Sequence, residues 1–172
     1  MKFDLGCGYK KREGFVRVDQ DSHVVPDILH DLDVLPWPIE SDCAEELCMM
    51  HILEHLAPLP NDYRRLWQEI YRICKPEAKI VIEVPHWAHD TFFADPTHVR
   101  PITPVTIAMM DQQRNLADIA SGGCESTLGL QWNVDFALDT VGYGTDNMSG
   151  LPVICRYNVT AKKPERKCLS KS

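Results

Sequence analysis

The sequence contains no long apolar run and no apolar segment at its N-terminus. None of its stretches approaches the roughly eighteen consecutive apolar residues of a membrane span, and the first residues lack the apolar region of a signal peptide. Internal repeats and low-complexity tracts are absent as well. We therefore expect a cytoplasmic protein that does not bind membranes, with one domain over residues 1–162 of the 172.

Paired-cysteine motifs are also missing. The seven cysteines include no C-x-x-C pair, and most of them stand in apolar runs. Their odd number and scattered positions argue against a disulfide framework. We expect reduced thiols that pack in the interior.

Positive charge is scarce outside the C-terminus. The formal net charge is −7, and residues 162–172 carry a net charge of +4, which leaves −11 for residues 1–161. An acidic body repels a phosphate backbone, which disfavours a nucleic-acid partner. We expect the basic C-terminal tail, residues 163–172, to be disordered.

Short apolar runs, typical of buried parallel strands, dominate the first half of the chain. They cover residues 2–5, 15–19, 27–30, 46–50 and 80–84. Asn61 is a candidate N-cap for a helix with one apolar face, and Thr103-Pro104 predicts a second helix that runs to about Ala120.

Alternating apolar residues over 130–138 and again over 153–161 predict an antiparallel hairpin at the end of the chain. The fold class is therefore α/β, with a mostly parallel sheet closed by a C-terminal antiparallel hairpin.

The early strands are joined by unusually short connections. Only residues 6–14 separate the first two strands and residues 20–26 the next pair, whereas a parallel crossover usually needs a dozen or more residues. One face of the sheet should therefore have few helices and expose apolar side chains. We expect a homo-oligomer in which a partner subunit covers that face.

A glycine turn follows the first predicted strand, and an acidic residue ends the second. Gly6 and Gly8 allow a sharp turn that brings backbone N–H groups close to a ligand. Asp19 is placed to accept hydrogen bonds from ribose hydroxyls. A dinucleotide fingerprint would need a third glycine where Lys11 stands, so the pattern favours S-adenosylmethionine, whose ammonium group Asp4 could bind.

From Asp4 to about Trp87 the chain resembles the class I S-adenosylmethionine-dependent methyltransferases, especially the small type 11 enzymes. The resemblance includes the segments 4–8, 27–32, 51–56 and 73–76, and it implies a Rossmann-like sheet. Two departures are the Glu77-Ala78 pair in place of two glycines and the absence of a segment for the family's leading helix. The implied cofactor-binding residues are Asp4, Gly6, Cys7, Gly8, Asp19, Asp31, Leu32 and His51.

The methyl acceptor should bind where the fourth and fifth strands end, because open α/β sheets bind ligands at the carboxyl ends of their strands. His86 is our first candidate for a general base and His51 the second, since a histidine can take a proton from an oxygen or nitrogen acceptor. The candidate substrate-binding residues are His89, Asp95, His98 and Arg100. The predicted function is methyl transfer to an oxygen or nitrogen of a small polar molecule.

Three other interpretations are open. His51–His55 spells H-x-x-E-H, a zinc-hydrolase motif when it lies on a helix, but Pro58 and Pro60 leave little room for one. Five metal-ligating side chains occur within residues 86–98, which would suit a metal-assisted methyltransferase. We expect no metal. A protein that binds the cofactor without catalysis has the same sequence features.

Overall fold

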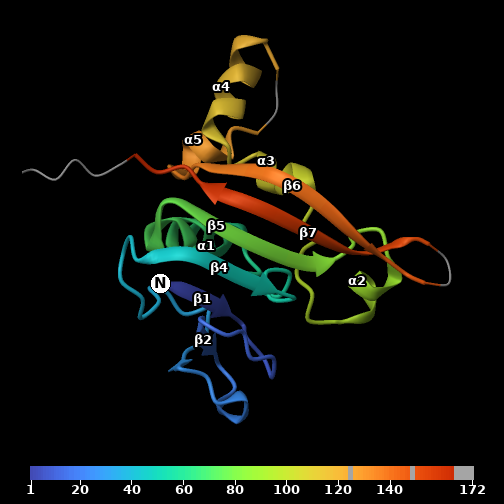
Figure 1. The fold of residues 1–172 in the computed structure, drawn as a ribbon. Helices are drawn as coiled ribbons and strands as arrows, with labels where there is room; N and C mark the ends of the chain where they lie inside the picture. The colour runs from blue at the N-terminus through green and yellow to red at the C-terminus, as the bar shows by residue number, and fades with distance from the viewer. Residues whose placement is uncertain (124–125, 148–149, 165–172) are drawn as a thin grey trace, which may run out of the picture.

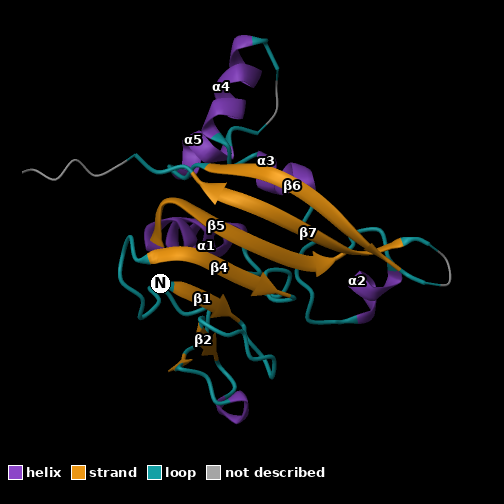
Figure 2. Cartoon of the chain, viewed as in Figure 1, coloured by secondary structure: helices purple, strands orange, loops and turns teal. Residues whose placement is uncertain are grey.

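The structure is a computed structural model that describes residues 1–123, 126–147 and 150–164. Helices pack behind and at the ends of one sheet and leave much of its other face open (Figures 1 and 2). The strands are β1 (Lys2–Leu5), β2 (Val16–Asp19), β3 (Ile28–Leu29), β4 (Ala44–Met50), β5 (Cys74–Pro85), β6 (Phe136–Thr145) and β7 (Pro152–Ala161). The helices are α1 (Pro60–Ile73), α2 (Asp90–Ala94), α3 (Pro104–Ala108), α4 (Gln112–Ala120) and α5 (Leu128–Trp132), with a 3-10 turn, η1, at Ser22–Val24.

Within the described residues, seven strands form the sheet in the order β3-β2-β1-β4-β5-β7-β6. Neighbouring strands from β3 to β5 are parallel, whereas β7 runs antiparallel to both β5 and β6. The register pairs Leu5 with Met49 and Met49 with Ile82, which places their side chains on one face of the sheet. The predicted parallel sheet with a C-terminal antiparallel hairpin is confirmed.

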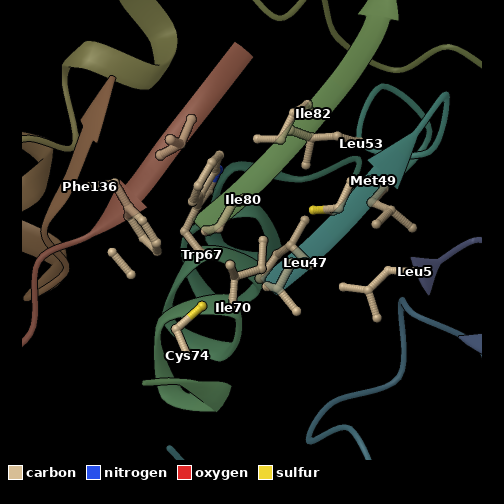
Figure 3. Packing of buried hydrophobic residues seen from close by; sticks show 14 of the residues in the cluster. Leu5, Leu47, Met49, Leu53, Trp67, Ile70, Cys74, Ile80, Ile82 and Phe136 are labelled. Carbon is tan, nitrogen blue, oxygen red and sulfur yellow. The ribbon is translucent and has the colours of Figure 1, made fainter. Parts of the chain in front are cut away.

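Helix α1 packs on that face and provides much of the core. Figure 3 shows Trp67 and Ile70 of α1 close to Leu47 of β4 and Ile80 of β5, and all four side chains are buried. Each such burial contributes roughly 1.5–3 kcal/mol. The helix therefore holds β4 and β5 in register, and these two strands position the loops at their carboxyl ends.

The start of α1 differs from the prediction. Leu59 is the N-cap and makes no side-chain hydrogen bond, while Pro60 occupies the first turn. Asn61 lies inside the helix, so its predicted role as N-cap is wrong. Proline is favoured here because its missing N–H would have no partner in the first turn.

The predicted helix over residues 103–120 is divided in two. Thr103 caps α3 as expected, and its side chain accepts the N–H of Thr106. Asp111 then adopts an extended conformation and accepts the N–H of Arg114, which starts α4. An aspartate side chain readily competes with the helical hydrogen bonds in this way.

The alternating residues over 130–138 do not form a continuous strand. Leu128–Trp132 is helix α5, and β6 begins only at Phe136. Asn133 ends α5 with a φ of +55° in the left-handed region, a conformation that asparagine tolerates better than most residues. Gly129 of α5 packs closely against the backbone of Met110. A Cβ at this position would lie 2.7 Å from the carbonyl oxygen of Met110.

Arg17 of β2 connects the two short crossovers that replace helices. Its guanidinium donates to the carbonyl oxygens of Gly8, Val24 and Val25 at 2.8–2.9 Å, and the residue is 7% exposed. A buried cation thus satisfies three backbone acceptors from both loops. The loops that follow β1 and β2 are fixed by this side chain.

The other face of the sheet has no helix in front of β4, β5 or β7 among the described residues (Figure 1). A thinly covered face was predicted, and the groove over it is lined by charged residues as well as by the expected apolar ones. The face carries the ion pairs Lys2–Glu46 at 2.6 Å and Arg156–Glu83. The groove has a volume of about 640 Å³ and lies over these strands. The charged side chains of this face can contact water, although parallel sheets are usually covered on both faces.

Part of the predicted tail is ordered against the fold. Nζ of Lys163 donates to Asp42 Oδ1 at 2.5 Å and to the carbonyl oxygens of Arg72 and Cys74. Residues 165–172 lie outside the described residues. The described cysteines are free thiols, in agreement with the sequence. No helix in the described part of the chain is long and apolar enough to cross a membrane.

Candidate functional site

The glycine turn after β1 approaches the loop after β4 closely. Gly6 has a φ of +67°, and a Cβ on it would lie 2.6 Å from Cγ1 of Ile52. The N–H groups of Gly6 and Cys7 both donate to the carbonyl oxygen of Val18, which fixes the turn on β2. Only glycine fits this position without displacing Ile52.

Asp19 holds this turn to the start of the next loop. Its Oδ2 accepts the N–H of Gly8 at 2.9 Å, and its Oδ1 accepts the N–H of Asp21 at 2.9 Å. The thiol of Cys7 lies 3.9 Å from Oδ2 and is only a weak donor. A carboxylate oxygen has two lone-pair sites, so Asp19 keeps acceptor capacity for a ligand.

A cavity of about 340 Å³ opens where β1, β2, β3 and β4 end. Four of the predicted cofactor-binding residues line it: Gly6, Asp19, Asp31 and Leu32. The sequence prediction missed seven others, Gln20, His30, Asp33, Ile52, His55, Leu56 and Thr97. Of these seven residues, Asp33 could have been predicted from the sequence, because it follows the same strand as Asp31. It accepts the N–H of Ala57 at 2.8 Å and so joins the two walls of the cavity.

A second cavity of about 420 Å³ adjoins the first, and Leu32 and Asp33 line both. Its other walls come from the loop before α1 and from α1 itself, where Asp62 and Arg65 provide charged groups. The two cavities therefore share a wall, and both are lined by charged groups as well as apolar side chains.

Asp4 does not line the first cavity. Its side chain is buried, and its Oδ2 lies 3.5 Å from Nε of Arg12, on the face of the sheet opposite α1. Burial raises the pKa of Asp4, and the Arg12 guanidinium opposes that shift. Burial also raises the pKa of the Cys7 thiol, which is therefore an inert group beside Asp19.

The segment after β5 folds back over the turn that follows β4. The N–H of Val99 donates to the carbonyl oxygen of Glu54 at 2.9 Å, and the Arg100 guanidinium donates to the carbonyl oxygen of Ala57. The Arg100 guanidinium also lies 3.9 Å from the ring centroid of Tyr63. Arg100 thus fastens the two segments together, a structural use that the sequence prediction of a substrate contact did not include.

The other predicted substrate residues differ in their surroundings. His89 is the N-cap of α2, where Nδ1 accepts the N–H of Thr91. Asp95 accepts both the N–H and the hydroxyl of Thr97, and these hydrogen bonds lower the pKa of Asp95. The side chain of His98 is 6% exposed and stacks on Phe92. Only Thr97 of this segment lines the first cavity, with His55 beside it.

The two candidate bases lie at the ends of neighbouring strands but in different environments. His51 follows β4, and its ring lies 3.5 Å from Glu54 Oε1 and 3.4 Å from Glu83 Oε1. Interaction with Glu54 raises the pKa of His51, against the opposing effect of burial. His86 stacks on Trp87, and its Nδ1 accepts the N–H of Ala88 at 3.2 Å. Neither histidine is among the residues that line the first cavity.

The H-x-x-E-H segment does not form the helix that a zinc hydrolase of this type requires. Residues 51–56 are turns that follow β4, and His51 has a φ of +53°. His51 and His55 are therefore not one helical turn apart on a common face. Of the five side chains within residues 86–98 considered for metal binding, only His98 belongs to a cluster of potential ligands in the described structure.

No family model and no curated protein matches the sequence. Solved structures do match the fold. An S-adenosylmethionine-dependent methyltransferase from Archaeoglobus fulgidus is 18% identical and superimposes with a TM-score of 0.61, covering 94% of this chain and 85% of its own. Another from Methanosarcina mazei is 15% identical, with a TM-score of 0.54 and coverage of 95% and 92%.

A third similar structure contains bound ligands. It is 1,6-didemethyltoxoflavin-N1-methyltransferase from Burkholderia thailandensis, solved with 1,6-didemethyltoxoflavin and S-adenosylhomocysteine. It is 11% identical, with a TM-score of 0.55, and the match covers 94% of this chain and 71% of the enzyme. At these identities the likeness is one of fold.

Proposed function

Because the chain has the fold of class I S-adenosylmethionine-dependent methyltransferases, we propose that it transfers a methyl group from this cofactor to an oxygen or nitrogen of a small polar molecule. The observation that carries the proposal is the cavity of about 340 Å³, in which Gly6, Asp19, Asp31 and Leu32 meet. Open α/β sheets bind nucleotide-like ligands at this edge.

The residues present fit an adenosine group. Each oxygen of Asp19 accepts one backbone N–H, and each retains a lone pair that can accept a ribose hydroxyl. Asp31 and the backbone of Leu32 line the cavity at the end of β3, where they can bind the adenine edge. Gly8 has open space where a side chain would project, while its N–H and carbonyl oxygen are bonded to Asp19 and Arg17.

S-adenosylmethionine, when bound, supplies a methyl group on a positively charged sulfur. The chain itself then has two tasks, which are to align the acceptor with that methyl group and to take up the acceptor's proton. His86 and His51 remain our candidates for the proton acceptor. Asp95, His98, His89 and Arg100 belong to the segment that closes over the turn after β4, and we propose that this segment shapes the acceptor site.

The small polar acceptor is supported by charge and by the lining of the second cavity. Asp33, Asp62 and Arg65 line the second cavity with groups that hydrogen-bond polar molecules. The net charge of −7 weakens binding to nucleic acid, so a nucleic-acid acceptor does not form part of the proposal.

Replacing Asp19 with alanine should weaken cofactor binding. Charge-assisted hydrogen bonds to the ribose contribute about 1.5–3 kcal/mol, so the affinity for S-adenosylmethionine should fall roughly 10- to 150-fold. Calorimetry with S-adenosylmethionine and S-adenosylhomocysteine measures this directly, and NAD and ATP should give no signal.

Asp21→Ala is a matched control, because its carboxylate binds the nearby His23 and lies at the start of η1. It should change the affinity by no more than about twofold. Equal binding by Asp19→Ala and the parent protein would show that the ribose does not bind at Asp19. Cofactor binding with no turnover on any acceptor would instead favour a protein that binds the cofactor without catalysis.

We also propose that a second copy of the chain covers the groove over β4, β5 and β7. The face carries both signs of charge, with Lys2 and Arg156 beside Glu46 and Glu83, so two copies related by a twofold axis can pair opposite charges. Sedimentation equilibrium at low salt should show a dimer that dissociates as the salt concentration rises, because exposed ion pairs are screened. A monomer that persists at high protein concentration in low salt would refute this.

A further inference from the structure

Three potential metal ligands from two distant parts of the chain meet beside the cofactor cavity. They are Glu54 and His55, in the turn after β4, and His98, in the segment after α2. Their ligand atoms lie within 4.8 Å of one another. Two metal bonds of about 2.0–2.1 Å at a tetrahedral angle would place the ligand atoms roughly 3.4 Å apart, so a modest closing movement would complete the site.

Glu54 gives the cluster its strongest indication of a missing partner. The side chain is 1% exposed, and neither carboxylate oxygen accepts a hydrogen bond from any described residue. The imidazole of His51 lies 3.5 Å from Oε1, where it can form an ion pair but not a normal hydrogen bond, and Oε2 has neither kind of partner among the described residues. A carboxylate taken out of water without hydrogen bonds costs several kcal/mol unless a cation compensates it.

Both histidines are oriented so that one ring nitrogen is free to bind a cation. Nδ1 of His98 lies 2.6 Å from the carbonyl oxygen of Phe92, which can only accept, so the proton is on Nδ1. The hydroxyl of Thr97 donates to Asp95 at 2.6 Å and must therefore accept from Nδ1 of His55 at 2.9 Å. In both rings the lone pair is left on Nε2.

Such supporting hydrogen bonds accompany most metal-binding histidines, because they fix the ring orientation and the tautomer. The second carboxylate of the region adds negative charge, since Asp95 Oδ2 lies 3.9 Å from Nε2 of His98. Two neutral imidazoles and one carboxylate suit divalent first-row transition metals and are the ligand set of open, three-coordinate zinc sites.

We propose that Glu54, His55 and His98 bind one divalent transition-metal ion, with zinc as the probe that fits the ligands best. His55 and Thr97 also line the cavity of about 340 Å³, so an ion bound by these ligands would lie next to that cavity. Resting on the proposed function, the unfilled coordination position is suited to an oxygen atom of the methyl acceptor. This proposal departs from our sequence-based expectation of no metal. Of the H-x-x-E-H segment it uses only Glu54 and His55.

The test uses the full chain with zinc and cobalt and needs no cofactor or acceptor. Metal-free protein dialysed against excess Zn²⁺ should retain one ion per chain by elemental analysis, and Co²⁺ should give the visible absorption of a low-symmetry site. Zinc should also raise the melting temperature, because an ion that binds only the folded state stabilises it. Glu54→Gln and His98→Ala should abolish the retained ion and the thermal shift.

Two further variants separate metal binding from general effects. Thr97→Val keeps all three ligands but removes the partner of His55 Nδ1, and it should weaken zinc binding about 10- to 100-fold. His23→Ala removes an exposed histidine of η1 and should leave zinc binding unchanged. In metal-free protein Glu54→Gln should be as stable as the parent or more so, since it removes a buried charge.

Retention of zinc by Glu54→Gln at the parent level, or no retention by the parent protein, would overturn the proposal. The outcome is independent of the proposed function, because Asp19→Ala should lose cofactor affinity and keep zinc. If the parent protein binds zinc but does not bind the cofactor, the proposed methyltransferase function is refuted and the proposed metal site is supported.

Discussion

Replacing Arg17 with alanine should destabilise the fold by about 3–5 kcal/mol. The guanidinium is buried and donates to three carbonyl oxygens, and each hydrogen bond from a charged donor is worth about 1.5–3 kcal/mol. Those carbonyls belong to the loops that follow β1 and β2, and they would lose their partners together. For a chain of this length the expected fall in melting temperature is roughly 6–20 °C.

Arg17→Lys should lie between the parent and the alanine variant, since an ammonium group keeps the charge but cannot reach three carbonyl oxygens in a plane. Arg64→Ala on the exposed side of α1 is the matched control and should change stability by less than about 0.5 kcal/mol. Urea unfolding followed by circular dichroism gives all three values. A loss below about 1 kcal/mol for Arg17→Ala would show that the two loops hold themselves in place.

This buried arginine accounts for how the sheet forms with such short crossovers. A crossover helix normally buries apolar side chains against the sheet. Here one cation bonds to the loops before and after β2, and the open face carries charged side chains among its apolar ones. The glycine turn at Gly6–Gly8 is therefore held by Asp19 and Arg17, two side chains of the same strand.

The sequence was most informative where local chemistry alone determines the structure. Apolar runs of four or more residues predicted the parallel strands, and the glycine turn followed by Asp19 predicted one wall of the cavity. These patterns depend on residues close together in the chain. Thr103 was identified as a cap for the same reason.

Prediction failed where a side chain had two possible uses. Asp111 and Asn133 lie in periodic segments, yet one caps a new helix and the other ends one in the left-handed region. For Arg100 and His89 the predicted substrate contact stays a prediction, and the structure adds a hydrogen bond from each to a backbone group. Position in the chain identifies the loop, whereas the direction of a side chain depends on what packs against it.

The closeness of Glu54 to His98 could not be predicted from the sequence, for a different reason. The two residues are far apart in the chain, and they meet because the segment after α2 pairs with the turn after β4 through Val99. The H-x-x-E-H pattern suggested a metal through His51 and His55 on a helix. The turn instead directs His55 toward a ligand supplied by another segment.

The choice of base can be tested by replacing each histidine singly. Loss of a positioned general base typically costs about 10²–10⁴ in rate, so His86→Ala should retain cofactor affinity while turnover falls by that factor. Turnover is measured as S-adenosylhomocysteine formed with a panel of small hydroxylated and aminated acceptors. His23→Ala, an exposed histidine of η1, is the control and should keep the parent rate.

For each histidine, an interaction in the structure opposes a role as general base. His86 must give up the N–H of Ala88 before Nδ1 can accept a proton, and His51 lies between Glu54 and Glu83, which favour its protonated form. Should turnover survive in His86→Ala but fail in His51→Ala, the base lies at the end of β4. Should both variants keep the parent rate, neither histidine is the base, and alignment of the acceptor with the methyl group carries the reaction.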